Sequence, residues 1–246
     1  MKFDLPGRNV HWFASIDSTM TVAARLAREG CASGTVVGAD EQTAGMGRHG
    51  HSWHSEPGAG LYVSLVLRHA LGAESLPLMM LALGLATQHA IAEVTGLAPD
   101  LRWPNDVLLG EKKCAGILAL LEGGAVIAGI GINVNHASFP PDIARLATSL
   151  RLNGASASRE ELLPALVRAV DDSSNVLAED GPAAICDAFA RGSTYVQGRR
   201  VLVDQDNAVL EGVTAGLDPS GFLLLRQDNG TVTKIMAGGV RPILCS

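Results

Sequence analysis

The stretch LRWPNDVLLGEKKCAGIL, residues 101–118, decides the fold. Pro104 restricts the residue before it to an extended backbone. The amide of Asn105 and the carboxylate of Asp106 therefore emerge at a fixed turn after a strand. A second turn at Gly110 follows, and then a lysine pair and an apolar strand. The stretch predicts consecutive strands whose first turn presents two polar side chains.

Lysine is rare in this sequence, and two of its four lysines stand side by side after that turn. They are Lys112 and Lys113; the others are Lys2 and Lys234, and the remaining positive charge comes from arginine. A lysine is a compact point charge that can reach a single carboxylate or phosphate oxygen. The pair therefore favours a functional interpretation of the turn over a plain Asx turn, which would otherwise be the commoner explanation.

Around this stretch, segments typical of strands are interleaved with segments typical of helices. Ser158 and Glu161 have the spacing of a capping box, and the sequence Asp-Ser-Thr at residues 17–19 offers polar caps to an earlier helix. Such interleaving indicates a layered structure of the α/β or α+β kind. We expect strands at residues 11–16, 35–40, 61–67, 101–103, 107–109, 115–121 and 125–134, and helices at 20–29, 76–94, 158–177 and 182–191.

The pattern changes near residue 195. From there, short segments of strand character are joined by Asp-Asn, Pro-Ser-Gly and Asp-Asn-Gly turns. Strands at this regular spacing indicate a small antiparallel barrel. We therefore divide the chain into domains of residues 1–194 and 195–246. The strands expected in the second domain are 200–204, 208–217, 222–227 and 231–236.

Composition limits the functional classes. The 246 residues are 47% hydrophobic and 18% charged, which is typical of a globular protein with a sizeable core. The net charge is -6, and no run of Lys or Arg provides the basic patch that phosphate binding needs. This argues against nucleic-acid binding as the main function. The apolar segment 76–85 is too short to span a bilayer, so we expect a core helix there and no membrane association.

Cysteine usage and the N-terminal sequence indicate the compartment. Cys31, Cys114, Cys186 and Cys245 are widely spaced and form no Cys-x-x-Cys pair. This argues against a zinc ribbon and against a disulfide scaffold, and it suits a reducing cytosol. Residues 1–8 contain no apolar signal-peptide core. We therefore expect a cytoplasmic protein.

The glycine-rich loop, residues 45–60, contains GMGRHG, which fits the Gly-x-Gly-x-x-Gly dinucleotide fingerprint by letter. That fingerprint requires a helix after the third glycine, whereas a proline, more glycines and a strand follow here, so we reject a dinucleotide fold. The loop amides and Arg48 could hold a phosphate or carboxylate; an ordinary flexible loop is the alternative. His49, His51 and His54 lack a nearby cysteine or carboxylate cluster, so we interpret them as solvated rather than as metal ligands.

Four segments, in order along the chain, resemble the signature of biotin protein ligases. The fourth segment, residues 129–133, contains Gly129 and Gly131. Glycines weaken a strand, so their presence there suggests that a ligand or another part of the chain approaches the strand closely. The joint order and spacing of the segments are highly specific, and the likeness extends to Ala-Gly-Gly at residues 237–239 and so covers nearly the whole chain. The four segments are DST at 17–19, QTAGMGRHGHSW at 42–53, RWPND at 102–106 with KCAGIL at 113–118, and GIGIN at 129–133.

The resemblance implies an α+β fold, in which a mixed-sheet catalytic domain of the biotin/lipoate ligase type precedes a small C-terminal SH3-like β-barrel. It implies an ATP-dependent biotin protein ligase that forms biotinyl-5'-AMP and transfers biotin to a specific lysine of a biotin carboxyl carrier protein, as in acetyl-CoA carboxylase or a related carboxylase. ATP, biotin and Mg²⁺ would be the cofactors, with no metal bound by the protein alone. Some members carry an N-terminal winged-helix DNA-binding domain; here the ligase-like region begins near His11, so we expect the ligase-only form.

The resemblance also implies a role for each matching residue. Arg48 and Lys113 would neutralise the biotin carboxylate and the α-phosphate, and Asp106 would orient the incoming lysine amine and accept its proton. These three are the implied catalytic residues. The implied biotin-binding residues are Ser18, Thr19, Gln42, Gly45, Gly47, Arg48, Lys113 and Gly116. The implied ATP-binding residues are Arg48, Trp53, Asn105 and Asn133.

Two positions depart from the family pattern. Met46 stands where members commonly carry arginine or another polar residue, and Met20 stands where Asn or Gln is common. Less positive charge over the loop could weaken retention of the adenylate, and the sequence leaves the effect of Met46 and Met20 open; Arg48 and Lys113 are in place. Two alternatives stay open: a lipoate-protein ligase on the same fold, and a non-catalytic biotin-binding module. The sequence also leaves open whether the protein is a monomer or a homodimer.

Overall fold

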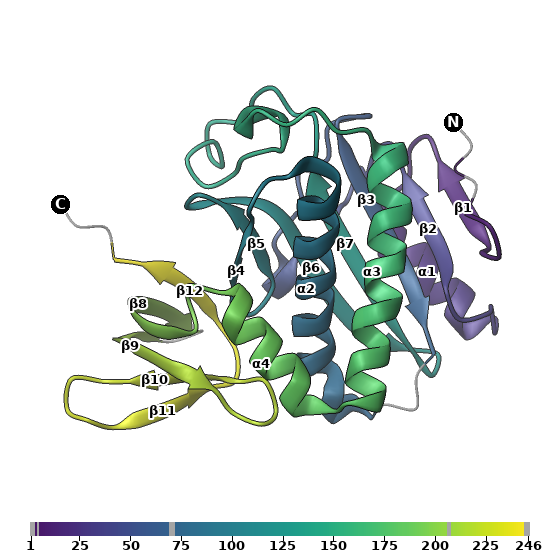
Figure 1. The fold of residues 1–246 in the computed structure, drawn as a ribbon. Helices are drawn as coiled ribbons and strands as arrows, with labels where there is room; N and C mark the ends of the chain where they lie inside the picture. Colours follow the sequence, from purple (N-terminus) through teal and green to yellow (C-terminus); the bar gives the residue numbers. More distant parts are fainter. Residues whose placement is uncertain (1–2, 4, 69–71, 206–207, 244–246) are drawn as a thin grey trace.

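Two sheets of unequal size form the protein (Figure 1). The computed structural model describes residues 3, 5–68, 72–205 and 208–243. The larger sheet has the strand order β1-β2-β3-β7-β6-β5-β4; β1 and β2 are parallel and the other neighbouring pairs are antiparallel, so the sheet is mixed. Its strands are β1 (Val10–Phe13), β2 (Thr35–Ala39), β3 (Gly60–Leu67), β4 (Asp100–Arg102), β5 (Asp106–Leu109), β6 (Lys112–Glu122) and β7 (Ala125–Asn133).

Helices cover both faces of the larger sheet. Val36 and Val37 are neighbours on β2, so their side chains point to opposite faces. Val36 belongs to the main core, which includes residues of α2 and α3, and Val37 belongs to a smaller cluster with residues of α1. The two faces are thus packed independently. The helices are α1 (Thr19–Arg28), α2 (Leu76–Thr95), α3 (Arg159–Glu179) and α4 (Pro182–Gly192).

The apolar helix α2 lies in the interior. By length and composition it could cross a membrane, but 56% of its most apolar window is buried inside the protein. Leu81 and Leu83 are fully buried although they are only two residues apart on the helix, because α2 packs against both α3 and β6 (Figure 1). Packing on more than one side therefore accounts for the apolar sequence, as expected for a core helix.

The smaller sheet holds five antiparallel strands in the order β11-β10-β9-β8-β12. Its core is continuous with that of the larger part, since Val201 and Leu225 belong to the same cluster as Leu101. The indole Nε1 of Trp103 also donates to the carbonyl of Gly221 at 3.0 Å. The turn after β4 is therefore anchored on the smaller sheet. Its strands are β8 (Gln197–Gln205), β9 (Ala208–Leu217), β10 (Leu223–Arg226), β11 (Val232–Ile235) and β12 (Gly239–Pro242).

The fold class and most elements agree with the sequence expectations. The α+β class is confirmed, with a mixed sheet and a small C-terminal β domain; the boundary at residue 194 stays a prediction. The strand expected at 11–16 ends at Phe13, and Ile16 makes only an isolated bridge to Gln42. Strand β12 was not predicted, because its glycine and proline are untypical of strands. Lys2 and Cys245 lie outside the described residues.

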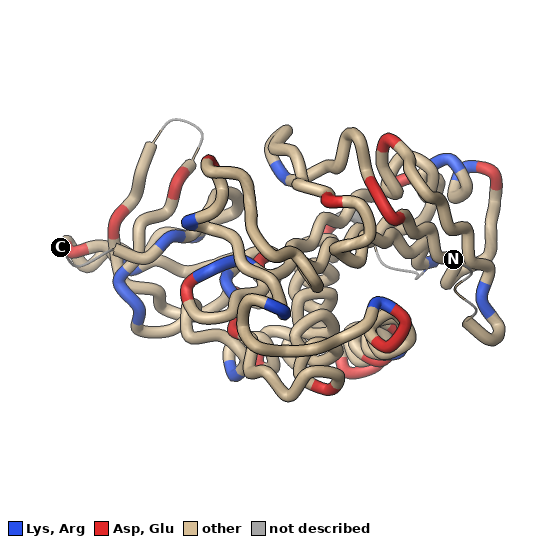
Figure 2. The backbone as a smooth tube through the Cα atoms, turned by 90° about the horizontal axis from the view of Figure 1, so that it is seen from above, with Lys and Arg blue, Asp and Glu red and all other residues tan. Residues whose placement is uncertain are grey.

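Two further details bear on the sequence interpretation. The 3₁₀ turn Arg48–Gly50 lies inside the glycine fingerprint, and no helix stands between its third glycine, Gly50, and the start of β3, a stretch that is described throughout. This confirms that the loop is not a dinucleotide-binding βα turn. Basic and acidic positions are interspersed along the described backbone (Figure 2). Many of them pair, as Arg200 does with Glu211 and Asp228. No run of basic positions stands apart from acidic ones along the described backbone (Figure 2).

Candidate active site

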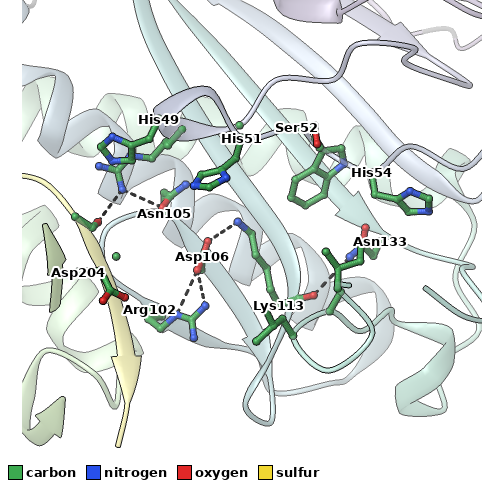
Figure 3. Close-up of a pocket in the computed structure, with 18 of the residues that line it drawn as sticks. His49, His51, Ser52, His54, Arg102, Asn105, Asp106, Lys113, Asn133 and Asp204 are labelled. Carbon is green, nitrogen blue, oxygen red and sulfur yellow. Dashed lines mark hydrogen bonds and ion pairs between the residues drawn. The ribbon is translucent and has the colours of Figure 1, made fainter. Parts of the chain in front are cut away.

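A cavity of about 620 Å³ opens between the larger sheet and the C-terminal strands (Figure 3). Its wall comes from the loop 47–54, the β4–β5 turn, the segment 139–147 and the chain near Asp204 and Gly238. A smaller cavity of about 50 Å³ lies beside it, against β6 and β7. The two cavities therefore meet at a shared set of residues. These are Gly47, Arg48, Trp53, Asn105 and Lys113.

Asp106 holds two cations at the edge of the larger cavity (Figure 3). Its Oδ1 lies 2.6 Å from Nζ of Lys113, and its Oδ2 accepts from the guanidinium of Arg102 at 2.7 Å and 3.2 Å. Antiparallel pairing of β4 with β5 places Arg102 opposite Asp106, and Lys113 comes from the neighbouring strand β6. The three charges are therefore positioned by the sheet itself.

The charge state of Asp106 follows from these neighbours. Burial alone would raise the pKa of its carboxyl, but the positive charges of Lys113 and Arg102 outweigh burial and hold that pKa below its usual range. The carboxylate is therefore ionised at neutral pH. An anion with such a low pKa is a weak base, so it is better suited to holding cations than to accepting a proton.

Arg48 ties three distant parts of the chain together. Its guanidinium donates to the carbonyl of Gly238 at 3.2 Å and to Oδ1 of Asn105 at 3.4 Å. Nδ2 of Asn105 in turn donates to the carbonyl of Ile117 on β6 at 2.8 Å. A guanidinium has five N–H donors and stays charged in proteins. Arg48 can therefore keep these contacts and still hold an anion where the two cavities meet.

The indole ring of Trp53 lies against two glycines of the sheet. A β-carbon at Gly116 would come within 2.7 Å of the ring, and one at Gly131 within 2.5 Å. These distances are too short for any side chain, so the glycines make room for the indole. Nζ of Lys113 lies 5.4 Å from the ring centre, within the range of a cation–π interaction. The indole Nε1 is buried without a hydrogen-bond partner among the described residues; it is a donor that a ligand could satisfy.

Polar groups gather in the smaller cavity around Thr19. The backbone N–H and the hydroxyl of Thr19 approach Oε1 of Gln42 at 2.9 Å and 3.0 Å, and that hydroxyl also lies 2.8 Å from the hydroxyl of Ser64. The glutamine amide is thus held in one orientation beside the cavity. Hydrogen-bonding groups set among apolar walls are typical of sites that take a small polar ring.

Asn133 stands where β7 leaves the sheet. Its amide donates to the carbonyl of Thr148 at 3.0 Å and reaches the carbonyl of Lys113 at 3.5 Å. The side chain is buried. Asn133 therefore fixes the segment after β7 against the strand that carries Lys113, and it lines the larger cavity in doing so.

Most residues that the sequence singled out come together at the two cavities. Ser18 and Gly45 line neither. The hydroxyl of Ser18 caps α1 by accepting from the N–H of Met20, and the carbonyl of Gly45 accepts from the N–H of Trp53. The implied roles of these two residues, like those of the residues that do line a cavity, stay predictions. Of the residues with an implied catalytic or binding role, those that line one or both cavities are Thr19, Gln42, Gly47, Arg48, Trp53, Asn105, Asp106, Lys113, Gly116 and Asn133.

Sequence reasoning missed part of the site. Arg102 was quoted within the motif but given no role; the register of the β4–β5 hairpin is the signal that pairs it with Asp106. The segment 139–147 contributes apolar side chains without any helix or strand periodicity that could have indicated it. Met20 and Met46, the two departures from the family pattern, both line the smaller cavity.

Two family models match the chain. Residues 12–136 match the biotin/lipoate A/B protein ligase family, and residues 197–240 match the C-terminal domain of biotin protein ligases. The first match spans the larger sheet from residue 12 in β1 to the end of β7, together with α1 and α2, and ends before α3 and α4; the second spans most of the smaller sheet.

Individual proteins are also similar. The bifunctional ligase/repressor BirA of Bacillus spizizenii is 32% identical over 251 residues, which cover 98% of this chain and 76% of that protein. The biotin–[acetyl-CoA-carboxylase] ligase of Mycobacterium tuberculosis is 32% identical over 222 residues, covering 88% and 81%. Among solved structures, the biotin protein ligase from Aquifex aeolicus in complex with biotin and ATP has a TM-score of 0.82 at 31% identity, covering 94% of this chain and 97% of that chain.

Proposed function

The chain belongs to the biotin/lipoate A/B protein ligase family and is a biotin ligase, and we propose that it works in two steps. In the first, the biotin carboxylate attacks the α-phosphate of ATP, which gives biotinyl-5'-AMP and releases pyrophosphate. In the second, a lysine amine of a biotin carboxyl carrier protein attacks the activated carbonyl. Biotin then forms an amide with that lysine, and AMP leaves. The carrier is a domain of acetyl-CoA carboxylase or of a related carboxylase.

The meeting of the two cavities at Arg48 and Lys113 carries this proposal. A cavity of about 620 Å³ is large enough for a nucleotide. The smaller cavity, with the polar groups of Thr19 and Gln42, suits the ureido ring of biotin. The carboxylate of one ligand and the α-phosphate of the other would then meet between two cations. Without those cations the two anions would repel as they approach, so their charge lowers the barrier.

Biotin requires the smaller cavity to widen, since about 50 Å³ is well below the size of a typical ligand site. Trp53 lines both cavities, and movement of its ring would merge them. Its indole N–H, which has no acceptor within the described part of the chain, would then gain a ligand or water as acceptor. Met20 and Met46 line the same space with flexible side chains that adapt to a ligand's shape.

Asp106 acts chiefly by electrostatics in this scheme. It orients Lys113, and it attracts the ammonium of the carrier lysine toward the acyl-adenylate. Its lowered pKa makes it a poor acceptor for the amine's proton. This revises the role implied by the resemblance, which included proton acceptance.

Mg²⁺ enters with ATP in this proposal. Among the described residues, the larger cavity offers the carboxylates of Asp106 and Asp204, and both are paired with basic side chains. Such a donor set does not form a magnesium site of its own. ATP phosphates and water are the usual ligands where a protein supplies few oxygens. Charge neutralisation at the α-phosphate therefore falls to Arg48 and Lys113.

The proposal also includes a cytoplasmic location and a function that does not involve nucleic acid. Cys31, Cys114 and Cys186 are free thiols in the structure, which suits a reducing cytoplasm. The net charge of -6 supports a function without nucleic acid.

Mass spectrometry of a carrier domain tests the function. The purified protein is incubated with ATP, Mg²⁺, the carrier domain, and either biotin or lipoate. The expected result is a single added biotinyl group on the carrier and none with lipoate. Lipoylation of the carrier would favour the lipoate ligase instead, and an unmodified carrier with both acids would favour a non-catalytic binding module.

A further inference from the structure

Three metal-ligating side chains converge beside the larger cavity. They are His54 and Glu56 on the glycine-rich loop and His136, three residues after β7, and their ligand atoms all lie within 4.8 Å of one another. No other group of three such side chains converges among the residues that the structure describes. The cluster differs from the loop set considered from the sequence, because His49 and His51 are not part of it.

His136 is fully buried, and its Nε2 is hydrogen-bonded to a tyrosine hydroxyl. The hydroxyl of Tyr62 lies 3.2 Å from the carbonyl of Glu56 and 3.2 Å from Nε2 of His136. The carbonyl can only accept. When the hydroxyl donates to Glu56, its oxygen takes a proton from Nε2, which is the tautomer that leaves Nδ1 without a proton.

In that tautomer Nδ1 of His136 carries a free lone pair. This atom is buried and has no hydrogen-bond partner among the described residues. A buried acceptor without a donor costs free energy, which a bound cation would recover. The hydrogen bond at the opposite ring nitrogen is the arrangement that orients histidine ligands in metal sites.

We propose that His54, Glu56 and His136 form a site for a divalent transition metal of the zinc type. Two imidazoles and one carboxylate suit zinc, cobalt or nickel, whereas magnesium prefers oxygen ligands alone. Tetrahedral zinc with ligands at about 2.0–2.1 Å brings donor atoms to about 3.3 Å from one another. The cluster therefore needs a small contraction, with His54 and Glu56 moving toward the buried His136. Water would complete the coordination.

The site would join the glycine-rich loop to the chain that leaves β7. His54 follows Trp53 directly and lines the larger cavity. Phe139, which lines the same cavity, stacks on the ring of His136 with centroids 5.1 Å apart. A bound metal would thus hold the loop against one wall of that cavity. This inference concerns the metal alone and does not depend on the proposed ligase reaction.

Zinc binding by the untagged, chelator-treated protein tests the proposal. Isothermal titration with zinc chloride should show one site per chain, and zinc should raise the melting temperature. Cobalt should give a tetrahedral absorption spectrum without a thiolate charge-transfer band. His54→Ala and Glu56→Gln lie on the loop rather than in the core, and each should weaken zinc binding at least tenfold.

The controls are matched in residue type. His89→Ala and Glu179→Gln change exposed positions on α2 and α3, and both should bind zinc as the wild type does. The proposal is overturned if the wild type binds no zinc. It is equally overturned if His54→Ala and Glu56→Gln both bind zinc with unchanged affinity, or if the cobalt spectrum shows a cysteine ligand. His136→Ala is not required, so a folding defect of that buried variant does not affect the outcome.

Discussion

Nζ of Lys113 lies 2.6 Å from Oδ1 of Asp106, and the ammonium in this ion pair stands where the two cavities meet. Lys113 lines both cavities, whereas Asp106 lines only the larger one. Arg102 holds the other carboxylate oxygen. In the protein without ligand, the carboxylate of Asp106 thus holds Lys113 in place. The same lysine would contact the anionic group of a ligand once that ligand is bound. A bound phosphate would compete with Asp106 for Lys113, so binding and release of ligand are coupled to this pair.

Arg48→Ala should release biotinyl-AMP and label unrelated lysines. The guanidinium is placed at the junction of the cavities by Asn105 and Gly238. Loss of hydrogen bonds to a charged group costs about 1.5–3 kcal/mol, so the adenylate should dissociate roughly tenfold faster or more. Biotinylation of albumin in the reaction measures the leak. Arg28→Ala, which removes a surface ion pair with Glu122, is the control. Equal albumin labelling by the wild type, Arg48→Ala and Arg28→Ala would contradict the role of Arg48 in retaining the adenylate.

Asp106→Asn should slow transfer to the carrier more than it slows adenylation. Asparagine keeps the shape but removes the charge that attracts an incoming ammonium. The expected loss in transfer is about tenfold to hundredfold, in line with the loss of one charged hydrogen bond. Pyrophosphate release and carrier biotinylation are followed separately in single-turnover experiments. If both rates fall equally, Asp106 acts only by holding Lys113.

The same substitution should change how stability depends on pH. The folded-state pKa of Asp106 lies below its ordinary value, so the ion pairs stabilise the fold fully above about pH 4. That contribution is lost as the pH falls through the folded-state pKa. Urea unfolding between pH 6 and pH 3 should therefore show a wild-type advantage over Asp106→Asn that shrinks only at the acid end. An advantage that grows on acidification would contradict the lowered pKa.

Gly131→Ala should disturb the indole of Trp53 without unfolding the protein. The new β-carbon would lie 2.5 Å from the ring, so the ring must move. We expect changed tryptophan fluorescence and a higher KM for biotin or ATP. Gly84→Ala is the control, because a β-carbon there meets Phe189 at 3.5 Å, an ordinary contact. Unchanged fluorescence and KM in Gly131→Ala would show that the close packing is not required.

Short sequence motifs predicted the residues at the centre of the site, but few of the residues around them. Asp106 and Lys113 stand seven positions apart in one motif, so the strands that carry them could be predicted together. Arg102 belongs to the same motif, but its pairing with Asp106 depends on hairpin register, which was not worked out from the sequence.

Longer-range contacts had no local signal. Arg48 reaches the carbonyl of Gly238 across 190 positions. His54 meets His136 only because β3 pairs with β7 and brings the loop beside the end of that strand. Histidine spacing along the loop suggested solvated side chains, since the third ligand-bearing segment lies far away in sequence. Contacts of this kind depend on tertiary packing rather than on any periodicity.

Pyrophosphate release by Lys113→Ala is the most direct test of the account. The measurement follows a single turnover with biotin, ATP and Mg²⁺ for the wild type, Lys113→Ala and Lys112→Ala. Lys112 is the exposed neighbour on the same strand and serves as the matched control. Loss of one electrostatic contact to the reacting phosphate costs about 3 kcal/mol, so release should fall roughly a hundredfold in Lys113→Ala and stay unchanged in Lys112→Ala. Wild-type release by a folded Lys113→Ala would contradict the claim that the shared cation drives adenylation.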